Sequence, residues 1–83
     1  MYTIIVAPRA KKELKNIIKL YRKALVEAID DLADNPLIGK PLTLELTGMY
    51  SYKIGVYRII YKINKKDKII LILTAGHRAN VYK

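Results

Sequence analysis

The chain has 83 residues, of which 52% are apolar and none is cysteine, and this composition excludes a disordered segment, a disulfide scaffold and thiolate chemistry. Sixteen Lys and Arg against seven Asp and Glu give a formal net charge of +9, which favours a polyanionic partner, nucleic acid or acidic protein, over a merely solvated lysine-rich surface. No apolar run reaches the length of a membrane span, so we expect one cytoplasmic domain over residues 1–83 and no membrane partner.

The N-terminal half predicts a strand followed by helix. "YTIIVA", residues 2–7, is short, apolar and β-branched, and Pro8 ends it, as is typical of a strand. Apolar residues then recur at helical spacing from Pro8 to Asp34. One straight helix of this length would measure about 40 Å, whereas a globule of this size is only about 30 Å across. We therefore predict two helices joined near residues 18–20.

The C-terminal half predicts three strands after a loop. Residues 36–49 contain two prolines and two glycines and are typical of a loop. The strands follow at Tyr50–Ile54, Tyr57–Ile63 and Ile69–Thr74, separated by turns at 55–56 and 64–67. The element order β-α-α-β-β-β predicts an α+β fold, with a helical pair packed on a small, mainly antiparallel sheet.

The hairpin around Gly55-Val56 brings two cations together. A two-residue turn at this position places Lys53 directly opposite Arg58. The same register gathers apolar residues on the other face, which should pack against the helices: Tyr50, Tyr52, Ile54, Tyr57, Ile59, Tyr61 and Ile63. Since opposite like charges are mildly destabilising, the pair indicates a bound anion, phosphate above all. Alternatively, both side chains are solvated on an exposed sheet face.

The C-terminal segment "TAGHRANVYK" supplies further candidates. Histidine titrates near neutral pH, so His77 is suited to proton transfer, although a lone histidine more often serves as a surface or capping residue. Arg78, next to a glycine turn, is a candidate phosphate ligand. Tyr82 would either stack on a base or close the core. One histidine and carboxylates concentrated in the second helical region make no metal site, and we expect no metal or cofactor.

Four segments taken together resemble the RelE/ParE toxin superfamily of toxin–antitoxin systems. They are "PRAKKELKNI", "ALVEAIDDLADNPLIGKPL", "LTGMYSYKIGVYRIIYKI" and "ILILTAGHRANVY", and the resemblance runs from about Tyr2 to Tyr82. It implies two helices rather than one. It also implies a RelE-like toxin that cleaves mRNA in the ribosomal A site, where the RNA 2′-hydroxyl attacks the adjacent phosphate. The implied partners are the ribosome, mRNA and an acidic RelB-like antitoxin, which would form a hetero-oligomer with the toxin.

The resemblance assigns catalytic roles, by position, to four residues: Lys53, Arg58, Arg78 and Tyr82. We also expect Lys62 and Lys83 to bind RNA. The sequence departs from RelE at Gly55, where RelE has a second lysine. The missing cation would lower activity, shift proton transfer to His77, or mean that the chain is not a nuclease.

Two other functions remain open at this point. A ParE-like toxin would bind and poison DNA gyrase without nuclease activity, and an inactive basic module would only bind. Because the superfamily shares one fold across different targets, the fold alone cannot decide between these functions.

Overall fold

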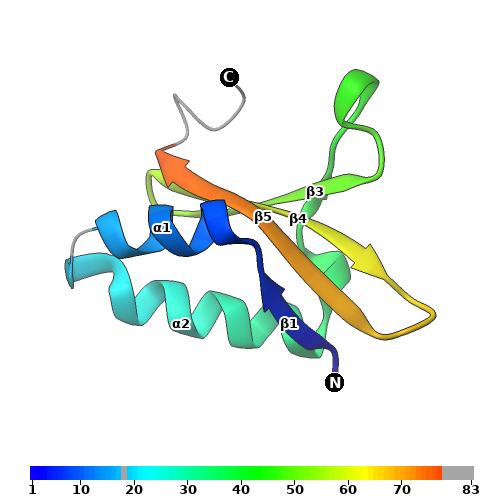
Figure 1. The fold of residues 1–83 in the computed structure, drawn as a ribbon, viewed down its shortest axis with the longest axis horizontal. Coiled ribbons are helices and arrows are strands. Elements are labelled where there is room, and N and C mark those ends of the chain that lie inside the picture. The colour runs from blue at the N-terminus through cyan, green and yellow to red at the C-terminus, as the bar shows by residue number, and fades with distance from the viewer. Residues whose placement is uncertain (18, 78–83) are drawn as a thin grey trace.

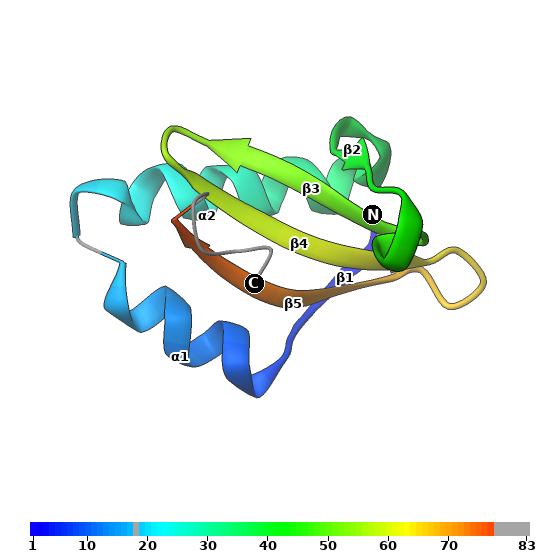
Figure 2. The same ribbon diagram turned by 90° about the horizontal axis from the view of Figure 1, so that it is seen from above.

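A computed structural model describes residues 1–17 and 19–77, in which two helices pack against a five-stranded sheet of order β1-β5-β4-β3-β2 (Figure 1). The elements, in chain order, are β1 (Thr3–Val6), α1 (Pro8–Asn16), α2 (Lys19–Asp34), the 3-10 turn η1 (Pro36–Ile38), β2 (Lys40–Pro41), the 3-10 turn η2 (Leu44–Leu46), β3 (Met49–Ile54), β4 (Tyr57–Asn64) and β5 (Ile69–His77). In the view of Figure 2, β3 and β4 run in front of α2, and α1 lies on the β5 side of the sheet. The predicted α+β fold is therefore confirmed.

The helical region divides in two, as the size argument predicted. α1 starts with Pro8, whose missing N–H costs nothing in a first turn. It ends where Ile17 turns to extended backbone (φ −75°, ψ 129°), and α2 begins at Lys19. The break thus starts one residue before the predicted joint. A molecule whose longest dimension is 34 Å could not have covered one helix of about 40 Å.

The register of the β3–β4 hairpin is the predicted one. Lys53 pairs with Arg58, and the three other predicted pairs are also present. Gly55 has a φ of +60°, which a two-residue hairpin turn requires and glycine adopts without strain. On the helix side, Ile59 and Tyr61 are fully buried against α2 residues Leu25 and Leu32. The predicted apolar face is therefore the face that packs on the helices.

The segment 36–49 holds more structure than the predicted loop. Between the two 3-10 turns, Lys40 pairs with Ser51 and Pro41 pairs with Tyr50, which adds β2 to the edge of the sheet. Proline is tolerated there because an edge strand need not donate every N–H. A strand of two residues carries no periodic pattern, so the sequence does not predict it.

The last strand is longer than predicted and contains a β-bulge. β5 continues past Thr74 to His77 because Tyr57, at the start of β4, still offers a pairing partner. Ala75 and Gly76 have low strand propensity, so the sequence ends the strand too early. The pairing shifts by one residue between Ile60 and Tyr61 of β4. This shift reverses which face each later residue of β5 occupies.

α1 protects the part of β5 that β1 does not reach. β1 runs parallel to β5 only as far as Ile72. Beyond that point the Glu13 carboxylate of α1 accepts a hydrogen bond from the Thr74 hydroxyl (2.7 Å) and another from the Ala75 N–H (3.3 Å). The helix thereby satisfies backbone that would otherwise form an open sheet edge. Among the described residues, no helix is both long and apolar enough to cross a membrane.

Candidate functional site

The sheet face turned away from the helices, here called the open face, carries the predicted cation pair. Lys53 of β3 stands directly opposite Arg58 of β4, and Arg58 stands opposite Gly76 of β5. Side chains paired in this way lie about 5 Å apart at their Cβ atoms. Across β3, β4 and β5, the open face therefore carries two adjacent cationic side chains, followed by a glycine that has no side chain.

The two cations differ in their exposure to solvent. Lys53 is exposed, whereas Arg58 is partly buried and its Nη1 donates a long hydrogen bond to Ser51 Oγ (3.4 Å). Ser51 and Ile60, on the same face, are each only 4% exposed. The alternative of two fully solvated side chains therefore does not hold for Arg58. Partial burial lowers the effective dielectric around the guanidinium and strengthens its attraction to an anion.

Lys40 is a further cation of the open face that the sequence did not indicate. Its pairing with Ser51 places it on the same side of the sheet as Lys53, because directly paired residues share a face. Lys40 is exposed. Only the pairing of β2 with β3 reveals its position, since nothing in the pattern of residues 36–49 marks a strand.

Tyr61 fixes the backbone just before Lys40. Its buried hydroxyl donates to the Pro36 carbonyl (2.6 Å) and accepts from the Gly39 N–H (3.1 Å). Burial away from water raises the pKa of Tyr61 to about 12. The contact is tight, because a Cβ at Gly39 would fall on the tyrosine ring. We call this contact the Tyr61 latch; it ties segment 36–39 to the core and so positions Lys40 at the sheet edge.

Two other predicted site residues lie within the described part of the chain, and they occupy opposite faces of the sheet. Lys62 is exposed on the open face, four residues along β4 from Arg58, or about 13 Å away. His77 instead pairs with Tyr57, and their rings are 6.2 Å apart. Tyr57 itself packs edge-on against Tyr21 of α2 (4.9 Å). His77 therefore lies on the helix side, and the structure does not bring it together with Lys53 and Arg58.

Three predicted site residues, Arg78, Tyr82 and Lys83, lie outside the described residues, and their roles stay predictions. Within residues 1–17 and 19–77, no group of three His, Asp or Glu side chains is placed to hold a metal ion. The chemistry available on the open face is thus that of cations: binding an anion, stabilising negative charge and donating hydrogen bonds.

The two-layer fold and its cation-bearing open face are those expected of a toxin domain of the RelE/ParE type. Comparison with known proteins gives the same result: the family described as "ParE toxin of type II toxin-antitoxin system, parDE" matches residues 4–82, and the chain belongs to this family of toxins. Toxin RelG of Mycobacterium tuberculosis is 37% identical over 84 residues, which cover 99% of this chain and 97% of that protein.

Solved structures of toxin–antitoxin complexes share the fold. The RelBE2 complex from Mycobacterium tuberculosis contains a chain with a TM-score of 0.85 and 37% identity, covering 93% of this chain and 98% of that one. The archaeal RelE–RelB complex from Pyrococcus horikoshii OT3 gives a TM-score of 0.79 and 30% identity, covering 96% and 98%. The chain is therefore a type II toxin of the RelE family, and the resemblance seen in the sequence is confirmed.

Proposed function

We propose that this toxin is a ribosome-dependent endoribonuclease that cleaves mRNA in the ribosomal A site. The observation that carries the proposal is the direct pairing of Lys53 with the partly buried Arg58 on the open face. Two like charges placed opposite each other cost stability, and a phosphate above them would offset this cost. Of the functions considered, RNA cleavage is the one that uses such a site for chemistry.

In the proposed reaction, the RNA 2′-oxygen attacks the adjacent phosphorus and the bond to the 5′-oxygen breaks. The products are a 2′,3′-cyclic phosphate and a 5′-hydroxyl; the 2′-hydroxyl loses a proton and the leaving oxygen gains one. Negative charge grows on the nonbridging oxygens, where Arg58 can donate two parallel hydrogen bonds and Lys53 adds a point charge. Ser51 helps to hold the guanidinium in place through its hydrogen bond with Nη1.

The remaining predicted residues have subordinate roles in this proposal. Arg78 would be a second phosphate ligand, Tyr82 a stacking partner for a base and Lys83 an RNA contact. Lys40 and Lys62 share the open face, both on the side of the cation pair away from the Gly55 turn, and would bind neighbouring phosphates. The proposal gives no proton-transfer step to His77, because that residue lies across the sheet from Arg58.

A primer-extension assay on a defined mRNA in a purified translation system tests the proposal. We expect ribosome-dependent cuts at A-site codons. Arg58→Ala should reduce them by about 100-fold, the effect typical of losing one transition-state hydrogen-bond donor. The matched control is Arg22→Ala, which removes an exposed arginine of α2. Intact mRNA with folded wild-type protein would refute the nuclease. Pulse-labelling of DNA and protein synthesis would then test the ParE-like alternative, gyrase poisoning, against an inactive binding module.

We also propose that an acidic RelB-like antitoxin neutralises this toxin by covering the open face. Both structures compared above are toxin–antitoxin complexes, and the net charge of +9 suits an acidic partner. Chemical acylation of lysines in the purified complex provides the test. Lys53 should be protected relative to the free toxin, whereas a complex in which the whole open face reacts freely would refute this mode of neutralisation.

A further inference from the structure

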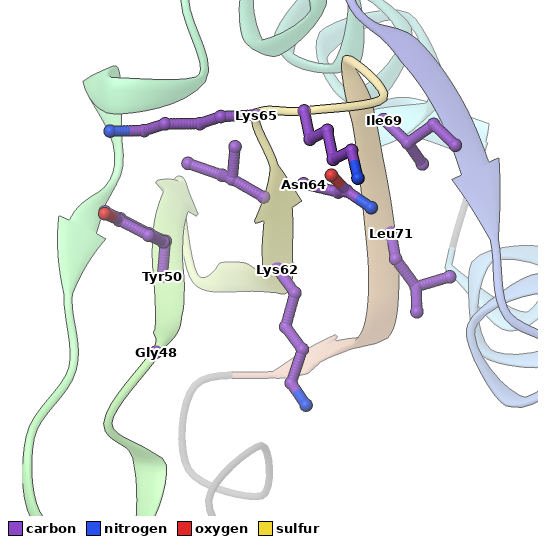
Figure 3. A pocket seen from close by; sticks show the side chains of 9 residues that line it. Gly48, Tyr50, Lys62, Asn64, Lys65, Ile69 and Leu71 are labelled. Atoms are coloured by element: carbon purple, nitrogen blue, oxygen red, sulfur yellow. The ribbon is translucent and has the colours of Figure 1, made fainter.

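A second cationic region lies at the end of the sheet where a turn joins β4 to β5, away from the Lys53–Arg58 pair. A cleft of about 720 Å³ opens there, and its walls include Lys62, Lys65 and Lys66, together with Tyr50 and two aliphatic side chains of β5 (Figure 3). We call it the turn cleft. Apart from Lys62, none of the residues that line it has a role in the proposed function, and the sequence indicated Lys65 and Lys66 only as turn residues.

The charge of the turn cleft is unbalanced. Among the residues that the structure describes, three lysines line it and no carboxylate does. Asp67, the acid in the same turn, is engaged with Asn64: its Oδ2 accepts from Asn64 Nδ2 (3.1 Å), and its N–H donates to Asn64 Oδ1 (3.0 Å). Lysines gathered around a concave surface create a positive potential that attracts a polyanion. The turn cleft is therefore electrostatically suited to phosphate groups.

The walls of the turn cleft also suit nucleobases. Ile69 and Leu71 of β5 are partly exposed there and offer an apolar surface. One face of the Tyr50 ring is stacked on Tyr61, with centroids 5.6 Å apart and planes 20° from parallel. This stacking keeps the Tyr50 ring on the helix side of the sheet with Tyr61, so the apolar surface offered to a base is that of Ile69 and Leu71.

Lys62 connects the turn cleft to the cation pair. It lines the cleft and shares the open face with Arg58, about 13 Å away along β4. This distance corresponds to a few nucleotides of a single strand. Lys62 is thus the next cation after Arg58 on the open face of β4, with the buried Ile60 between them, and it leads on to the lysines of the turn. An acidic peptide could also satisfy the lysines, but the continuity with a phosphate-binding pair favours RNA.

We propose that the turn cleft binds single-stranded RNA a few nucleotides from the scissile phosphate. Lys65 and Lys66 contact backbone phosphates, and Lys62 guides the strand toward Arg58. This inference rests on the proposed function, since it names a second subsite for the same RNA. The subsite supplies affinity and register; the chemistry stays at the cation pair.

Fluorescence anisotropy with a labelled single-stranded RNA, in the absence of ribosomes, tests the subsite. The variant is K65Q/K66Q, and the matched control is R22Q/K23Q, which removes two exposed charges from α2. We expect the first variant to weaken binding about fivefold to tenfold and to lower the salt slope, log K against log salt, by about 1.4 for two lost phosphate contacts. The control should bind nearly as the wild type does, and far-UV circular dichroism checks the fold of both.

Each result decides the question. Equal weakening in both variants would mean that only net charge matters, and would overturn the subsite. Unchanged binding in K65Q/K66Q would also overturn it. If a poly-glutamate peptide binds the wild type and loses affinity in K65Q/K66Q while RNA affinity is unchanged, the cleft accepts acidic protein instead. Because the assay involves no cleavage, failure of the subsite leaves the nuclease proposal standing. Specific RNA binding here, together with intact mRNA in the primer-extension assay with ribosomes, would refute the nuclease alone.

Discussion

Tyr61 connects the hydrophobic core to the segment that carries Lys40. Tyr61→Phe would keep the ring but leave the buried Pro36 carbonyl and Gly39 N–H without their partner. We expect the free energy of unfolding to fall by about 1–3 kcal/mol, measured by urea denaturation. The control is Tyr52→Phe on the neighbouring strand, which is only partly buried and should change stability by less than about 0.5 kcal/mol. Equal losses in the two variants would contradict a specific role for the latch.

The ionisation of Tyr61 should also make stability depend on alkaline pH. Burial raises the pKa of Tyr61 from 10.0 to about 12, so the folded protein retains a proton that the unfolded chain releases. The stabilisation is complete below about pH 10 and is lost as the pH rises toward 12, by up to about 2–3 kcal/mol. Urea midpoints of the wild type and Tyr61→Phe across this range should converge as the pH rises. A constant difference would show that the hydroxyl does not titrate in this window.

At the scale of elements, the contact between α1 and β5 depends on Glu13. Glu13→Ala removes the acceptor for the Thr74 hydroxyl and the Ala75 N–H, and we expect a loss of about 1–2 kcal/mol. Hydrogen exchange at the Ala75 amide should accelerate. The comparison is Arg9→Ala, which breaks only the 3.6 Å ion pair of a largely exposed arginine with Glu13 and should cost less than about 0.5 kcal/mol. If both substitutions cost the same, the backbone contact is unimportant.

Local rules were enough to predict the hairpin and the division of the helices. Gly55 fixes a two-residue turn, and strict alternation then determines every pair from Tyr50–Tyr61 to Ile54–Tyr57. The helix break followed from the size argument, and the family resemblance supported it. β2 could not be predicted, because two residues between 3-10 turns have no period. Lys40, a site candidate, was missed for the same reason.

The side of the sheet on which His77 lies depends on one β-bulge that the sequence pattern does not predict. Without the register shift beside Ile60 and Tyr61, alternation along β5 would turn His77 toward the open face, close to Arg58. With the shift it faces Tyr57 and the helices. Bulges depend on how strands twist and pair in three dimensions. Residue types alone therefore made His77 a site candidate but could not predict on which side of the sheet it lies.

Charge is distributed unevenly over the whole molecule. Four of the seven carboxylates lie in α2: Glu27, Asp30, Asp31 and Asp34. The open face, by contrast, carries Lys40, Lys53, Arg58 and Lys62. An uneven field of this kind orients a protein before contact, so that its cationic side meets a polyanion first. The fold thus places the open-face cations and most of the carboxylates on different elements.

The excess of positive charge leads to opposite effects of salt on stability and on RNA binding. At about 0.01 M salt the screening length is about 30 Å, comparable to the 34 Å longest dimension of the molecule, so the cations repel one another across the whole fold. At about 0.1 M it shortens to about 10 Å. The urea midpoint should therefore rise with KCl over this range, whereas affinity for single-stranded RNA should fall by at least about tenfold. A midpoint that falls with salt would mean that ion pairs outweigh repulsion, and an unchanged RNA affinity would mean that phosphate contacts do not dominate binding.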